Sequence, residues 1–210
     1  DMDILLVDAV NVFGNGYILP RGTLREPVSH IERADVCLLT KVDQAAVGSR
    51  EHICETIQQH NPKALIMESI HQPRCFISIK DWYEDIAGDG IDVARMTGKR
   101  VMAVSAIGNP ASFEQTLDDI GAEIIESLRF PDHHDYTIDE MKNVLDQAIA
   151  QGAEAIVITE KDAVKIPTAI VEAEWPIPVF VVSVEVTFQN GGEQFRTLLK
   201  QVLQEKIRRG

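Results

Sequence analysis

Short apolar runs alternate along the chain with segments in which apolar residues recur at helical spacing. The apolar runs, several of them nearly continuous as in strands covered on both faces, predict β-strands at 3–8, 35–40, 63–68, 100–106, 122–128, 154–158 and 178–186. The segments between and after them predict helices at 49–60, 110–120, 138–151 and 191–208. Strands that alternate with helices indicate an α/β fold with a mostly parallel sheet flanked by helices.

Capping residues mark three of the predicted helix starts. Ser49 is a good N-cap for the helix at 49–60. Asn109 precedes a proline, and proline fits the first turn of a helix. Thr137, followed three residues later by Glu140, has the spacing of a capping box.

Four polar loops directly follow predicted strands. They are DAVNVFGNG after 3–8, IGNPASF after 100–106, RFPDHHDY after 122–128 and TEKDAVK after 154–158. The carboxyl ends of parallel strands share one edge of a sheet, and ligands bind in the crevice outside that edge. If these strands lie in one sheet and run the same way, the four loops converge on one site.

The third of these loops places Asp132, His133 and His134 in consecutive positions. Histidine titrates near neutrality and acts as an acid, a base or a metal ligand. A neighbouring carboxylate fixes its tautomer or raises its pKa. An exposed loop without a role is the alternative, and a complete metal site needs more ligands than this loop supplies.

A second candidate lies in LPRGTLREP, residues 19–27, which holds Arg21, Arg25 and Glu26 between two prolines. Arginine offers a planar fork that suits phosphate or carboxylate, and Glu26 could orient an arginine. Surface arginines beside a turn are the simpler interpretation.

Structural explanations also exist for the polar residues of the other loops. Asn15, between two glycines, is typical of a tight turn. Asn109 is explained by helix capping alone. Thr159 could cap a short helix, and Lys161 and Asp162 could be a solvated pair.

Length and composition narrow the class of protein. The chain has 210 residues and a formal net charge of −13, enough for one large domain or two small lobes and too acidic for a uniformly basic nucleic-acid-binding face. A local basic pocket for phosphate stays possible. Its three cysteines have no CxxC spacing, which favours reduced, buried thiols over a zinc site or disulfide framework and fits a cytosolic setting.

Taken together, the stretches FGNGYILPRGTLREP, RAD, AIGNPASF, FPDHHDYT and TEKDAVKI resemble, in this order, the tetraacyldisaccharide 4′-kinases of lipid A biosynthesis. The resemblance covers residues 3 to about 166. It implies a two-lobed P-loop kinase that uses ATP and Mg²⁺ to phosphorylate the 4′-hydroxyl of a tetraacylated disaccharide 1-phosphate. It also implies a cytoplasmic enzyme, peripheral to the cytoplasmic face of the inner membrane.

The resemblance assigns roles to the candidate residues. In the family the histidine of the FPDHH-like motif pairs with an upstream acid, which favours His133 as the catalytic histidine, with His134 second and Asp132 as its orienting group. The substrate- and phosphate-binding residues are then Arg25, Glu26, Asn15 and Arg21, although the family usually has a small residue in place of Arg21. Supporting roles fall to Asn109, Lys161 and Asp162.

One family feature is absent from the sequence. No GxxxxGK[ST] motif occurs in the 210 residues. We therefore expect residues 1–210 to be the C-terminal portion of the kinase, inactive alone, with most ligands for ATP and Mg²⁺ in an upstream region. The alternative is a non-catalytic α/β module that binds a sugar phosphate or nucleotide; a sugar-nucleotide transferase lobe fits less well.

The last seven residues, QEKIRRG at 204–210, are mildly basic. Basic residues favour anionic lipid surfaces. They also suit the carboxyl end of any helix, where they complement the helix dipole. The second interpretation is the simpler one.

Overall fold

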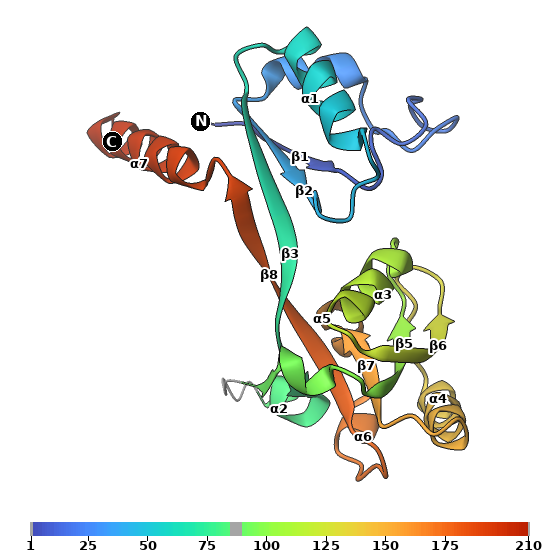
Figure 1. The fold of residues 1–210 in the computed structure, drawn as a ribbon. Coiled ribbons are helices and arrows are strands. Elements are labelled where there is room, and N and C mark those ends of the chain that lie inside the picture. The colour runs from blue at the N-terminus through green and yellow to red at the C-terminus, as the bar shows by residue number, and fades with distance from the viewer. Residues whose placement is uncertain (1, 85–89, 210) are drawn as a thin grey trace. The chain divides into compact units, whose positions relative to one another are not determined.

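The computed structural model describes residues 2–84 and 90–209, except for the side chains of residues 205–209. The chain divides into two compact units. The first unit comprises Asp1–His71 and Val186–Gly210, and the second comprises Gln72–Glu185. The chain leaves the first unit within strand β3 and returns to it within strand β8 (Figure 1).

The first unit is a sheet, parallel across β1, β2 and β3, with a helix on each face. Its elements are β1 (Ile4–Asp8), η1 (Val28–Arg33), β2 (Val36–Thr40), α1 (Ser49–His60), the first part of β3 (Leu65–Ser78), the end of β8 (Val179–Asn190) and α7 (Gly192–Arg209). Strand β2 pairs in parallel with both β1 and β3.

Alternation along β2 explains why both faces of this sheet are covered. Successive side chains of a strand point to opposite faces. Cys37 and Leu39 belong to a cluster with Ile53 and Ile57 of α1. Val36 and Leu38, one position out of phase, belong to a cluster with Phe195 and Leu198 of α7.

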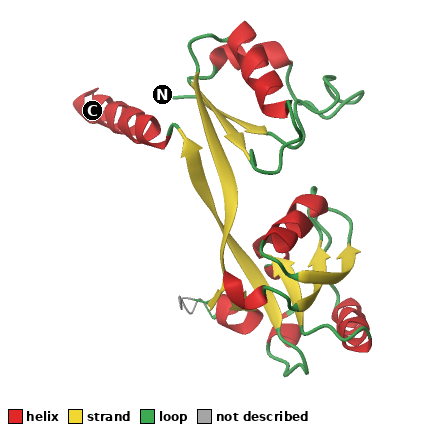
Figure 2. Ribbon diagram, viewed as in Figure 1, coloured by secondary structure: helices red, strands yellow, loops and turns green. Residues whose placement is uncertain are grey.

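The second unit holds the other strands and most of the helices (Figure 2). Its remaining elements are α2 (Ile79–Tyr83), β4 (Ile91–Asp92), η2 (Val93–Met96), β5 (Arg100–Ser105), α3 (Pro110–Asp119), β6 (Glu123–Arg129), α4 (Ile138–Ala150), β7 (Ala155–Thr159), α5 (Glu160–Ala163) and α6 (Thr168–Val171). Strands lie in the order β8-β7-β5-β6 and pair in parallel, whereas β4 pairs antiparallel with β3.

Strand β5 separates the two cores of this unit. Val101 and Ala103 pack in a cluster with Phe113 of α3. Met102 and Val104 pack on the opposite face, in a cluster that includes the buried residues of α4. A strand buried on both faces explains why its sequence is a continuous apolar run.

The predicted α/β class with a mostly parallel sheet is confirmed, and each predicted strand and helix has a counterpart. Three details differ. Strand β3 continues to Ser78 and β8 to Asn190, well past the predicted ends, and the region 72–99 contains α2, β4 and η2. Ser49 is the first residue of α1 rather than its cap, which is Gly48 in a left-handed conformation with φ of 83°.

Within the residues that the structure describes, no helix has both the length and the apolar composition needed to cross a bilayer. The side chains of residues 205–210 in the basic tail lie outside the described residues.

Candidate active site

The carboxyl ends of β5, β6 and β7 bring three of the four predicted loops together in the second unit. The carboxylate of Asp162, at the start of the loop after β7, is fully buried and links all three. Its Oδ1 accepts a hydrogen bond from the Ala106 backbone N–H at 2.9 Å and from the Tyr136 hydroxyl at 3.1 Å. Its Oδ2 accepts a hydrogen bond from the Thr159 hydroxyl at 2.6 Å. One buried carboxylate therefore holds residues from all three loops.

His133 presents its imidazole outward from this loop group. Its side chain is 87% exposed, and its Nε2 lies 3.8 Å from Oδ2 of Asp132, which is its recorded partner. The backbone of His133 has a φ of 64°, and its N–H donates to the carbonyl oxygen of Ala106 at 3.2 Å. The main chain is therefore held while the ring is accessible and lies beside a carboxylate.

His134 is anchored instead. Its Nε2 lies 3.1 Å from both carboxylate oxygens of Glu140, and its ring stacks on Phe130 with centroids 5.1 Å apart. Glu140 also accepts hydrogen bonds from the backbone and hydroxyl of Thr137, which completes the capping box predicted for α4. These hydrogen bonds from Thr137, and then the one to His134, lower the pKa of Glu140 to about 2. His134 thus ties the loop to the start of α4.

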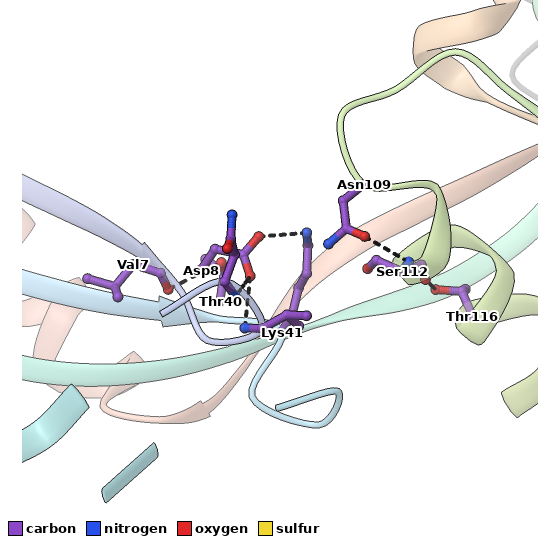
Figure 3. A network of polar contacts seen from close by, with 9 residues as sticks. Val7, Asp8, Thr40, Lys41, Asn109, Ser112 and Thr116 are labelled. Carbon is purple, nitrogen blue, oxygen red and sulfur yellow. Dashed lines mark hydrogen bonds and ion pairs between the residues drawn. The ribbon is translucent and has the colours of Figure 1, made fainter. Parts of the chain in front are cut away.

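Asn109 and Lys161, which were also predicted to have supporting roles, differ in their contacts. Asn109 caps α3, since its Oδ1 accepts a hydrogen bond from the Ser112 N–H at 3.2 Å (Figure 3). Lys161 is exposed, in contrast to its buried neighbour Asp162, so the two do not form a solvated pair.

The loop after β1 belongs to the first unit, and Asn15 organises it. The side-chain Oδ1 of Asn15 accepts from the Tyr17 N–H at 3.2 Å, and its Nδ2 donates to the Arg21 carbonyl at 3.3 Å. Gly22 is required here, because a Cβ atom at this position would lie 2.0 Å from the carbonyl oxygen of Tyr17. In this structure Asn15 shapes the turn.

The charged residues of this loop differ in what they contact. The guanidinium of Arg21 lies over the ring of Tyr17, 3.7 Å from the centroid. Glu26 forms an ion pair with Arg33 and also lies 3.1 Å from Nδ1 of His30, so the arginine that it holds is Arg33. Arg25 is exposed, and among the described residues no ion pair or hydrogen bond of its side chain is recorded. Of these arginines, Arg25 is the one with no recorded side-chain partner among the described residues.

An ion pair at the base of this loop was not predicted from the sequence. The Nζ of Lys41, directly after β2, donates to Oδ2 of Asp8 at 2.9 Å, and Oδ1 of Asp8 accepts from the backbone N–H groups of Val10 and Asn11 (Figure 3). Burial of Asp8 opposes ionisation, but the hydrogen bond and charge of Lys41, together with the backbone hydrogen bonds from Val10 and Asn11, outweigh it and lower the pKa of Asp8. The sequence contained a partial signal, because Asp8 ends one predicted strand and Lys41 directly follows another. No sequence pattern indicated that the two side chains would pair.

No group of three or more histidine, cysteine or acidic side chains is close enough to hold a metal ion within the part of the chain that the structure describes. The strand-end carboxylates of Asp8 and Asp162 already accept several hydrogen bonds each.

The three cysteines are free thiols, with Cys37 and Cys75 buried and Cys54 only partly buried. Burial raises the pKa of the Cys37 thiol to about 11, so it is protonated at neutral pH.

The predicted convergence of the four loops therefore holds for three of them. The loops after β5, β6 and β7 meet around Asp162 in the second unit. The fourth loop, which follows β1, lies in the first unit, as does the neighbouring segment that carries Arg25.

Comparison with a solved structure identifies the fold class of this chain. LpxK from Aquifex aeolicus, solved in complex with ATP, superposes with a TM-score of 0.56 at 21% identity, over 96% of this chain and 52% of that chain. At this identity the likeness establishes a shared fold. This chain therefore has the α/β fold of that kinase.

Sequence matches define the family. The model for tetraacyldisaccharide-1-P 4′-kinase matches residues 1–204. Tetraacyldisaccharide 4′-kinases from Anaeromyxobacter dehalogenans and Elusimicrobium minutum are 36% and 38% identical over 82% and 80% of this chain, and the alignments cover 44% and 42% of those proteins. The chain belongs to the tetraacyldisaccharide-1-P 4′-kinase family. It spans about half the length of the curated relatives that it matches.

Proposed function

We propose that the protein containing this chain transfers the γ-phosphate of ATP to the 4′-hydroxyl of a tetraacyldisaccharide 1-phosphate. Family membership supports the reaction class. The observation that carries the proposal is the loop group around Asp162, which holds the main chain of His133 while its imidazole faces solvent. Phosphoryl transfer depends on such positioning more than on covalent chemistry.

His133 serves, in this proposal, as the base that receives the proton of the attacking hydroxyl, or as the partner of a carboxylate base. A neutral imidazole accepts a proton near neutral pH. Asp132, 3.8 Å away, stabilises the imidazolium that forms. His134 ranks second in this proposal, because Glu140 and Phe130 hold its ring in the loop, whereas the ring of His133 is exposed.

Arg25 binds phosphate in the same proposal. Its side chain is exposed, and a guanidinium makes paired, charge-assisted hydrogen bonds to phosphate oxygens. Asn15 and Arg21 hold the turn that presents it, the first through backbone hydrogen bonds and the second through its contact with Tyr17.

ATP and Mg²⁺ belong to this proposal as cosubstrate and cofactor. When bound, Mg²⁺ supplies charge neutralisation of the phosphates. We place most of its ligands, together with the P-loop, in an upstream region, in line with the lack of a GxxxxGK[ST] motif in the sequence. Residues 1–210 are then the C-terminal portion of the kinase, inactive alone, and the whole enzyme works at the cytoplasmic face of the inner membrane.

A phosphate-transfer assay tests the function. Radiolabelled ATP and a tetraacyldisaccharide 1-phosphate are incubated with this chain and, separately, with the longest natural protein that contains it. The proposal expects labelled product with the longer protein and none with residues 1–210. If the longer protein is stabilised against heat by the disaccharide or by ATP but forms no product, the non-catalytic binding module replaces the kinase.

A further inference from the structure

We propose that Tyr136 and Asp162 are positioning residues that fix the loop segment of His133 for the phosphoryl-transfer step. This inference rests on the proposed function, since it assigns a role relative to His133. Neither side chain is exposed enough to meet a substrate, because Tyr136 is 4% exposed and Asp162 is fully buried. Their influence on the reaction would pass through the main chain of the loop.

A continuous set of hydrogen bonds joins the two side chains to His133. The Tyr136 hydroxyl donates to Oδ1 of Asp162 at 3.1 Å, and the same oxygen accepts from the Ala106 N–H at 2.9 Å. The carbonyl oxygen of Ala106 then accepts from the His133 N–H at 3.2 Å. Ala106 thus lies between Asp162 and His133, bonded to one through its N–H and to the other through its carbonyl.

The segment from His133 to Tyr136 is consequently held at both ends. Its first residue is bonded to Ala106 and its last residue is bonded to Asp162, to which Ala106 is also bonded. These two attachments, together with the contacts of His134 to Glu140 and Phe130, fix the main chain that carries the imidazole of His133.

The backbone of His133 needs such support. Its φ of 64° lies in the left-handed region, which is costly for residues other than glycine and persists where surrounding contacts hold it. A Tyr136 without its hydroxyl would release one end of the segment. The left-handed residue could then relax, and the ring would leave its position.

The environment of Tyr136 keeps it a hydrogen-bond donor. Its ring packs edge-on against Phe130 and His134, with centroids 5.1 Å and 5.5 Å apart. Burial, together with the charge of Asp162, raises the pKa of Tyr136. The hydroxyl is therefore protonated throughout the physiological range.

Tyr136→Phe is the direct test, because it removes the hydroxyl and keeps the ring. Tyr83→Phe is the matched control: its hydroxyl is also bonded within the second unit, to the carbonyls of Ala163 and Ile166 at 3.1 Å and 2.9 Å. Both variants are made in the longest natural protein, with and without His133→Ala. We expect Tyr136→Phe to lower kcat about 10-fold or more, since small misplacements of a reacting group are costly, with the KM for ATP unchanged.

The double variant separates positioning from general damage. If Tyr136 acts through His133, its substitution lowers kcat by less than about twofold in the His133→Ala protein, because the two losses are not additive for coupled residues. Equal losses in the two backgrounds, or a loss no larger than that of Tyr83→Phe, would overturn the inference.

Hydrogen exchange keeps this result distinct from failure of the proposed function. If His133→Ala reacts at nearly the rate of the unchanged protein, His133 has no role in the mechanism. Whether Tyr136 holds the loop is then measured separately. Mass spectrometry of the segment 130–137 should then show faster amide exchange in Tyr136→Phe than in Tyr83→Phe. Equal exchange in the two variants would show that Tyr136 does not hold the segment.

Discussion

At the scale of single residues, the two adjacent histidines differ in exposure and in side-chain contacts. His134 is 25% exposed at its side chain and is bound to Glu140, whereas His133 is 87% exposed. The left-handed backbone at His133 turns the chain between them. A ring that is held in the loop strengthens the fold, and a free ring can meet a substrate.

The carboxylate of Glu140 makes stability depend on acid pH. Its pKa in the folded chain is about 2, below the ordinary value of 4.5. A depressed pKa stabilises the folded state fully above the unfolded value, and this contribution is lost as the pH falls from about 4.5 toward 2. Glu140→Gln keeps an acceptor for Thr137 but removes the charge, so unfolding midpoints in urea should vary less with pH across this window.

Asp139→Asn is the control for that measurement, because Asp139 lies in the same helical turn and has no recorded bond to the cap among the described residues. If Glu140→Gln and the unchanged protein lose stability in parallel as the pH falls, Glu140 does not carry the effect.

Arg25 should contribute to substrate binding. Arg25→Met removes the guanidinium and keeps a long side chain. A hydrogen bond to a charged group is worth about 1.5–3 kcal/mol, so we expect the KM for the disaccharide phosphate to rise about 10- to 100-fold. Steady-state kinetics measure it, with Arg95→Met, an exposed arginine of the second unit, as the control. Equal KM values for the two variants would contradict a phosphate contact.

Sequence reasoning reached the residue types of the site and not their individual contacts. The DHHD stretch indicated a functional loop, but the choice of histidine depends on Glu140 and Phe130, whose approach only the folded loop defines. Asp162 was one of a polar pair in the sequence, and its burial depends on Ala106 and Tyr136, which lie 56 and 26 positions away.

At the scale of elements, the joint between β8 and α7 requires glycine. Gly191 has a φ of 80°, and a Cβ atom there would lie 2.7 Å from Cγ of Met67 in β3. Gly191→Ala therefore meets both backbone strain, about 1–2 kcal/mol, and overlap with a packed side chain, about 1–3 kcal/mol. We expect a loss of about 2–5 kcal/mol in the free energy of unfolding, measured in urea.

Gly98→Ala separates the two contributions. Gly98 has a similar φ of 72°, and a Cβ atom at this position would have no neighbouring atom within 4 Å. This variant should lose the strain energy alone. If both alanine variants lose the same free energy, Met67 does not restrict the joint.

Element boundaries were predictable where side chains cap or bury the backbone. The Thr137–Glu140 capping box and the Asn109 cap are found where the sequence placed them. The prediction ended this strand at residue 68 because Glu68 and Ser69 interrupt its apolar run, and His71, Gln72 and Pro73 follow soon after. The strand continues because Cys75 and Phe76 beyond them pair with β4, a contact that has no local signal.

At the scale of the whole molecule, periodicity predicted the α/β class, and the order of short motifs predicted the family. The division into two units was not predictable in detail, because β3 and β8 each contribute to both.

The most direct test is the single-turnover rate of phosphate transfer by His133→Ala in the longest natural protein that contains this chain, with His134→Ala as the comparison. A base or its partner contributes about 100-fold or more. The account predicts a fall of at least that size for His133→Ala, with ATP affinity unchanged and a smaller fall for His134→Ala. A His133→Ala rate within about threefold of the unchanged protein would contradict it.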